Sequence, residues 1–114
     1  MTFSHMFTIM RTRGFVSELS ETLQATVMEF GLKHINTQTD FIVFKPTHCE
    51  THYEDEGHSL TTYIEGLPKK LYAKLDDFGD PAKWTEMYDP ETVEDLKKAG
   101  TGRFVITFML AEEY

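Results

Sequence analysis

The chain has 114 residues, a length typical of one folded domain, and we expect a single domain over residues 1–114. Hydrophobic residues make up 40% of the chain and aromatic residues 13%, so it has enough apolar material for a core, which excludes a disordered chain. The formal net charge is −8, whereas binding to nucleic-acid phosphates needs a basic surface, so direct nucleic-acid binding is not expected.

The first segment alternates in a way that is typical of a β-strand. Over residues 3–11, Phe7 and Ile9 fall on one side of the alternation, and Met6 and Met10 fall on the other. Because both sides carry apolar residues, we expect this strand to lie in the centre of its sheet.

A helix is predicted from Ser17 to about Phe30. Ser17 suits the N-cap, because its hydroxyl can accept a hydrogen bond from the first turn. Gly31 follows, and glycine commonly ends a helix in the left-handed conformation. The apolar stripe of this helix consists of Leu19, Leu23, Val27 and Phe30.

Three further strands and one further helix are predicted downstream. Residues 41–44 form a short run that is apolar on both sides, and residues 59–65 and 103–111 alternate with period two. Asp89 and Pro90 suit the N-cap and first position of a helix that Gly100 would close. The last three residues, Glu112 to Tyr114, are expected to fray.

The segment Leu67–Asp89 supports two interpretations. Pro68 suits the first turn of a helix, and apolar residues recur after it at helical spacing. The alternative is a strand that pairs back onto residues 59–66. Further along, Trp84 and Tyr88 are aromatic anchors one helical turn apart.

The predicted order is strand, helix, strand, strand, helix, strand, with Leu67–Asp89 as an insertion before the last helix. This βαββαβ order resembles the ferredoxin-like fold, which implies an antiparallel four-stranded sheet with helices packed on one face. We therefore predict an α+β domain of this kind, with the first and last strands in its centre. The resemblance concerns element order alone, and no family motif accompanies it.

One window, THCETHYEDEGH at residues 47–58, concentrates groups that can bind a metal ion. Imidazole, thiolate and carboxylate groups are ligands that Zn²⁺ prefers, so zinc is the one cofactor considered. The alternative is a solvated loop, because Pro46 and the flanking strands disfavour the helix that would align two of the histidines. The zinc ligands would be His48, Cys49, His52 and His58.

Catalysis is a weaker alternative for the same window. A nucleophilic Cys49 needs a nearby cation to favour its thiolate, whereas carboxylates follow it closely in the chain. Those carboxylates have no apolar neighbours of the kind that keep a catalytic acid protonated. Phenylalanines on the predicted strands could stack nucleic-acid bases, but the few basic residues nearby favour core packing instead. We therefore expect binding rather than an enzymatic reaction.

The charge is unevenly distributed along the chain. Residues 1–46 are neutral overall, whereas residues 47–114 contain fifteen acidic and seven basic residues and so carry the whole −8. This layout favours a small acidic binding protein that acts by protein–protein contact, for example a modulator or inhibitor that occupies a basic surface of its partner. The predicted contact residues are Glu54, Asp55, Glu56, Glu91 and Asp95.

A single cysteine excludes an internal disulfide and agrees with a cytoplasmic location. No apolar run approaches the ~20 residues that span a bilayer, so no membrane association is expected. Two other functions remain open at this point. One is a metal-binding protein or metal-dependent enzyme that uses residues 48–58, and the other is a self-assembling structural subunit, that is, a homo-oligomer.

Overall fold

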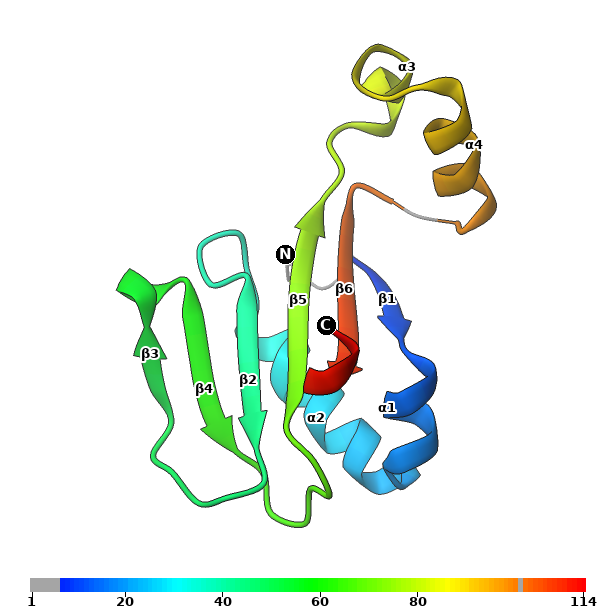
Figure 1. Ribbon diagram of the computed structural model, residues 1–114. Coiled ribbons are helices and arrows are strands. Elements are labelled where there is room, and N and C mark those ends of the chain that lie inside the picture. The colour runs from blue at the N-terminus through cyan, green and yellow to red at the C-terminus, as the bar shows by residue number, and fades with distance from the viewer. Residues whose placement is uncertain (1–6, 101) are drawn as a thin grey trace.

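A six-stranded mixed β-sheet is the central element of the computed structural model, which describes residues 7–100 and 102–114 (Figure 1). The order across the sheet is β1-β6-β5-β2-β4-β3. The pairs β1–β6 and β2–β4 are parallel, and the other three pairs are antiparallel. The strands are β1 (Phe7–Arg11), β2 (Phe41–Lys45), β3 (His52–Glu54), β4 (Ser59–Tyr63), β5 (Leu71–Asp77) and β6 (Phe104–Leu110).

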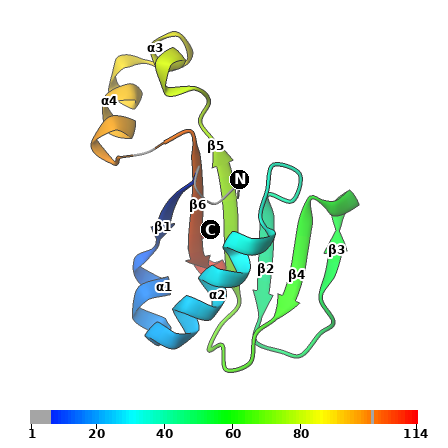
Figure 2. The same ribbon diagram turned by 180° about the vertical axis from the view of Figure 1, so that it is seen from behind.

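The helices form two groups. Figure 2 shows that α1 and α2 lie against one side of the sheet, whereas α3 and α4 project beyond the place where β5 ends and β6 begins. Short 3-10 turns complete the chain: η2 (Asp55–Gly57), η3 (Pro81–Lys83) and η4 (Ala111–Glu113). The helices are α1 (Arg13–Glu18), α2 (Glu21–His34), α3 (Trp84–Met87) and α4 (Pro90–Lys98).

The predicted ferredoxin-like fold is wrong, although the chain is α+β. That fold has four antiparallel strands, whereas this sheet has six strands and two parallel pairs. One extra strand is β5, where Leu71 and Leu75 lie four residues apart. A spacing of four residues fits both one face of a helix and one face of a strand, so it did not distinguish a helix from a strand. Ala73 between them is fully buried on that same face, which identifies the strand.

The pairing predicted for that strand is also wrong. β5 lies between β2 and β6, with Ala73 opposite Ile42 on one side and opposite Phe108 on the other. β4 instead pairs with β2 and with the edge strand β3. Ala73, Ile42 and Phe108 are all fully buried. This burial of apolar side chains favours the position of β5 between β2 and β6.

The first strand lies at an edge of the sheet, which corrects its predicted central place. Among the described residues, β1 pairs with β6 alone. The last strand does lie inside the sheet, and six of its seven residues are buried. Residues 3–6 of the predicted first strand lie outside the described residues.

Two helices stand where one was predicted. The Thr12 hydroxyl caps α1 by accepting a hydrogen bond from the Phe15 N–H at 3.3 Å. The Ser20 hydroxyl caps α2 by accepting from the Leu23 N–H at 3.2 Å. Ser17, the predicted cap, lies inside α1, where its hydroxyl donates to the carbonyl of Gly14 at 3.4 Å. The chain therefore changes direction between two consecutive capped helices.

Gly31 does not end a helix but lies within α2, which continues to His34. A Cβ atom at this position would lie 2.6 Å from the ring of Phe108 on β6. Glycine is therefore needed here because the helix backbone approaches the sheet closely.

The core lies between the sheet and the pair α1 and α2. Phe15 of α1 packs on Phe108 with ring centroids 5.8 Å apart, and Phe30 of α2 packs edge-on against Phe44 at the same separation. These contacts join both helices to the middle of the sheet. The largest fully buried side chains are Phe15, Phe44, Phe108, Ile42, Leu60, Leu71, Ile106 and Val27.

The C-terminal residues, which were expected to fray, form the η4 turn instead. Both oxygens of the Glu113 carboxylate accept hydrogen bonds, from the Thr12 hydroxyl, the Gly14 N–H at 3.0 Å and the Leu110 N–H at 2.9 Å. The Thr12 hydroxyl first, and then these backbone donors, hold the pKa of Glu113 below its usual value. The carboxylate thus connects the end of β6 to the start of α1.

Glu113→Gln should therefore lower the free energy of unfolding by about 1 kcal/mol at neutral pH, a small effect because the carboxylate is exposed. A lowered folded-state pKa contributes stability that is fully present above the usual glutamate pKa of about 4.3 and is lost as the pH falls through the lowered folded-state pKa. Urea unfolding at pH 7 and pH 3 measures this. The two proteins should differ at pH 7 and differ less at pH 3, and an equal difference at both would contradict the assignment.

Candidate functional site

The window at residues 47–58 contains the edge strand and the turn of the outer hairpin of the sheet, so it is not a loop alone. His52–Glu54 is the edge strand β3, which pairs with β4 across the η2 turn. In that turn Asp55 and Glu56 adopt positive φ angles of 52° and 55°. Aspartate adopts this conformation more readily than β-branched residues do, and Gly57 follows with φ 89°, so the sequence EDEG suits a tight turn.

The histidine of β3 is held by its own neighbours. His52 Nε2 lies 2.7 Å from Glu54 Oε1, and His52 Nδ1 lies 2.7 Å from the carbonyl oxygen of Glu50. This carbonyl first, and then the Glu54 carboxylate, raises the pKa of His52 above its usual value. Both ring nitrogens therefore already have partners within the hairpin.

The other predicted zinc ligands have contacts of their own. His48 packs against the ring of Tyr63, and His58 Nδ1 lies 2.9 Å from the carbonyl oxygen of Gln38. Cys49 is half-buried and is not in a disulfide. Across residues 7–100 and 102–114, no group of three or more His, Cys, Asp or Glu side chains is arranged to hold a metal ion. The zinc site at residues 48–58 stays a prediction.

The predicted partner-binding acids fall into two separate groups. Glu54, Asp55 and Glu56 belong to the β3–η2 hairpin, and Glu91 and Asp95 belong to α4. Figure 1 shows β3 at one edge of the sheet and α4 toward the other side, beyond the start of β6. The five residues therefore do not share one contact surface on the sheet.

The second group belongs to a projecting unit, residues 80–98, which we call the arm. Its organising side chain is Trp84, which is 2% exposed. The indole N–H of Trp84 donates to the carbonyl oxygens of Phe78 at 2.9 Å and Gly79 at 3.3 Å, and the Tyr88 hydroxyl donates to that of Phe78 at 3.1 Å. These bonds fix α3 to the segment that leaves β5.

The base of the arm is closed by a two-pronged ion pair. Arg103 donates from Nε to Asp77 Oδ1 at 3.0 Å and from Nη2 to Asp77 Oδ2 at 3.2 Å. The Phe78 N–H also donates to the Arg103 carbonyl at 2.7 Å. The Arg103 guanidinium, more than any other neighbour, lowers the pKa of Asp77. The chain therefore enters and leaves the arm through one bonded pair of strand ends.

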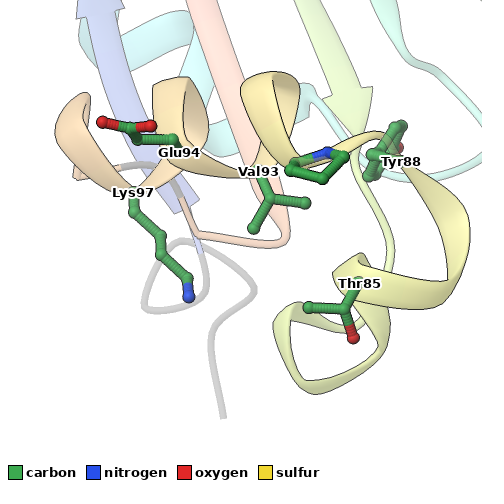
Figure 3. A pocket seen from close by; sticks show the side chains of 6 residues that line it. Thr85, Tyr88, Val93, Glu94 and Lys97 are labelled. Atoms are coloured by element: carbon green, nitrogen blue, oxygen red, sulfur yellow. The ribbon is translucent and has the colours of Figure 1, made fainter.

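A groove of about 290 Å³ opens between α3 and α4. In Figure 3, Val93 of α4 and Thr85 of α3 face one another across this space, and Lys97 extends beside them. The walls present the Tyr88 and Pro90 rings, the Val93 methyl groups and the Lys97 stem. Val93 is only 6% exposed, which makes it the floor rather than the rim. The lining residues are Thr85, Tyr88, Pro90, Val93, Glu94 and Lys97.

The unit that contains this apolar groove is acidic. The arm contains six acidic residues and three lysines, a net charge of −3, and all nine side chains are exposed. Only Glu94 pairs with a lysine of the arm, Lys98, at 3.1 Å. The acidic residues are Asp80, Glu86, Asp89, Glu91, Glu94 and Asp95. An apolar groove on an acidic unit suits a ligand that carries an apolar group beside positive charges.

Sequence reasoning found the aromatic anchors and two of the acids but missed the groove. Thr85, Pro90, Val93 and Lys97 were not identified as a set, since they belong to two different helices. A signal was present in the two prolines: Pro81 and Pro90 each stand at the first position of a short helical element. Two such starts nine residues apart indicate a pair of short helices that lie next to one another in the chain.

Comparisons with protein-family models, with curated proteins and with solved structures gave no match. In the part of the chain that the structure describes, no helix is both long enough and apolar enough to cross a membrane. The geometry of the arm is therefore the basis on which a function can be proposed.

Proposed function

We propose that this protein is a small acidic binding protein whose arm docks a basic segment of a partner protein. One apolar side chain of that segment would occupy the groove between α3 and α4, and its lysines or arginines would face carboxylates of the arm. The observation that carries the proposal is an apolar groove placed within an acidic, projecting surface. A modulator or inhibitor that occupies a basic surface acts in this way.

The size of the groove supports a protein side chain as the occupant. Small-molecule sites usually enclose about 300–1,000 Å³ and bury most of their ligand. This groove, at about 290 Å³, lies at the lower limit of that range and is partly open to solvent. A single apolar side chain of a longer segment fits such a space, and the flanking charges then provide orientation and faster association.

The proposal includes a cytoplasmic location. Cys49 is the single cysteine of the chain, so the fold requires no oxidising compartment. A reducing environment also keeps this half-buried thiol free.

The occupant can be defined by selecting peptides from a random display library on the purified full chain. We expect the selected peptides to share one aliphatic or aromatic residue flanked by lysine or arginine. Thr85→Arg is the groove-blocking variant, because Thr85 is exposed and lines the groove, so the fold should tolerate the change. Selected peptides should bind this variant at least about tenfold more weakly. Peptides that are basic but lack an apolar anchor would contradict the proposal.

Charge reversal in the arm should weaken binding of a selected peptide. The variant Glu91→Lys/Asp95→Lys should reduce affinity by about tenfold or more, and raising the salt from about 50 to about 300 mM should weaken wild-type binding. The matched control is Glu54→Lys/Asp55→Lys, which makes the same change of charge in the distant hairpin. Isothermal titration calorimetry measures all three proteins. An equal loss in the control would show attraction to net charge rather than recognition by the arm.

A further inference from the structure

The two edges of the sheet differ in how well they resist pairing with another strand. The β3 edge has three residues, includes His52 and Glu54, and ends in the acidic η2 turn. Short, charged edge strands of this kind discourage association. The β1 edge has five residues, and its one charged residue is Arg11 at its end. Of the two edges, β1 is therefore the one that could accept a further strand.

Apolar side chains are exposed on both faces of β1. Ile9 is 40% exposed and aligns with Ile106, on the side of the sheet that bears α1 and α2. Met10 is 44% exposed and aligns with Thr107, on the opposite side. A strand that is apolar on both faces is expected in the centre of a sheet, yet β1 lies at the edge. A partner strand would give β1 the central position that its sequence favours.

The backbone of β1 is also positioned for pairing. The Thr12 N–H donates to the Phe108 carbonyl of β6 at 3.0 Å, so the backbone groups of Thr12 point inward. Because successive residues of a strand point to opposite sides, the groups of Thr8 and Met10 also face β6, and those of Ile9 and Arg11 face outward. Among the described residues, no strand pairs with these outward groups.

We infer that a second copy of this chain pairs with this edge, so that the two β1 strands run antiparallel around a two-fold axis at Ile9. This arrangement places Ile9 opposite Ile9 of the second copy and Thr8 opposite Met10 of the second copy. The two six-stranded sheets then become one continuous sheet. The same surface serves both copies, as a two-fold interface requires.

The distribution of charge favours a second copy at this edge. Residues 1–46 are neutral overall, and the net charge of −8 belongs to residues 47–114. The arm projects from the end of the sheet at which β1 begins, because β1 and β6 are parallel. Antiparallel pairing therefore places the two acidic arms at opposite ends of the dimer. The two Arg11 residues stand about 13 Å apart along the strands. This distance exceeds the Debye length of ~8 Å at physiological salt, so their repulsion is largely screened.

Analytical ultracentrifugation of the full chain tests the inference. From about 10 to about 500 μM, the wild type should sediment as a dimer. The dimer dissociation constant of Ile9→Lys should be at least about tenfold higher. The matched control is Tyr53→Lys, because Tyr53 is the middle residue of the other edge strand and is 60% exposed. This variant should remain dimeric. Met10→Lys is a second variant at the β1 edge, and thermal melting by circular dichroism shows that each protein is folded.

Disulfide crosslinking tests the register. In a Cys49→Ser background, Ile9→Cys should form a crosslinked dimer on oxidation, because antiparallel neighbours of this kind have Cα atoms about 5.5 Å apart. Tyr53→Cys should stay uncrosslinked. A wild-type monomer across the whole concentration range would overturn the inference. So would a dimer that survives both Ile9→Lys and Met10→Lys, or equal crosslinking at Tyr53→Cys.

Discussion

Gly31→Ala should destabilise the protein, although alanine is the better helix former. The exchange favours the helix by about 1 kcal/mol in propensity. The new Cβ atom, however, would lie 2.6 Å from the ring of Phe108, which is fully buried between α1, α2 and the sheet. Since that ring cannot move without repacking the core, we expect a net loss of about 2 kcal/mol for alanine and about 3 kcal/mol or more for Gly31→Leu. Urea unfolding followed by circular dichroism measures both.

A double-mutant cycle identifies the cause of this loss. Phe108→Leu removes the ring atoms that the new Cβ would contact, so Gly31→Ala should cost less than half as much in that background. Glu29→Ala is the matched control for helix propensity, since Glu29 is an exposed residue of the same helix. Additive losses from the two core substitutions, or a stabilising Gly31→Ala, would show that α2 does not approach the sheet as described.

Trp84→Ala should unfold the arm while the sheet and its two packed helices stay folded. Removing a buried tryptophan costs about 3–5 kcal/mol, and within the arm only Val93 is buried besides Trp84. The arm would then lack both its core and the indole hydrogen bonds to Phe78 and Gly79. Hydrogen exchange should show protection lost in α3 and α4 and retained in α2 and β6. The neighbouring exposed residue provides the control, since Thr85→Ala should leave protection unchanged.

Fluorescence gives an independent measurement of the same event. Trp84 is the only tryptophan, so its emission reports the arm, whereas far-UV circular dichroism reports the whole chain. In Val93→Ala, the fluorescence transition should move to a lower denaturant concentration than the circular dichroism transition. Coincident transitions in this variant, or loss of protection throughout Trp84→Ala, would indicate that the arm and the sheet unfold as one unit.

Several elements followed from local sequence patterns. The strands at Phe41–Lys45, Ser59–Tyr63 and Phe104–Leu110 were predicted from alternation and apolar runs, and the structure confirms them. The start of α4 was predicted from Asp89 and Pro90, although the Asp89 side chain makes no capping hydrogen bond. These signals involve residues only a few positions apart, so they can be recognised from the local sequence without knowledge of the fold.

The errors arose where the deciding contact is distant in the chain. The place of β5 depends on neighbours at residues 42 and 108, and the role of Gly31 depends on a ring 77 positions away. The tail is ordered because Glu113 reaches back to Thr12 and Gly14. None of these partners can be inferred from spacing, because a local pattern does not specify which segments meet.

The candidate site divides in the same way. By itself, the sequence determined the acidity of the second half, the carboxylates Glu91 and Asp95, and the anchors Trp84 and Tyr88, since composition and short-range capping are local properties. Only the tertiary structure separated those two acids from the hairpin group at residues 54–56 and brought α3 and α4 together as an apolar groove. It also placed a strand with two apolar faces at the edge of the sheet. The physical reason is that grooves and sheet edges arise from packing between elements, which no single segment encodes.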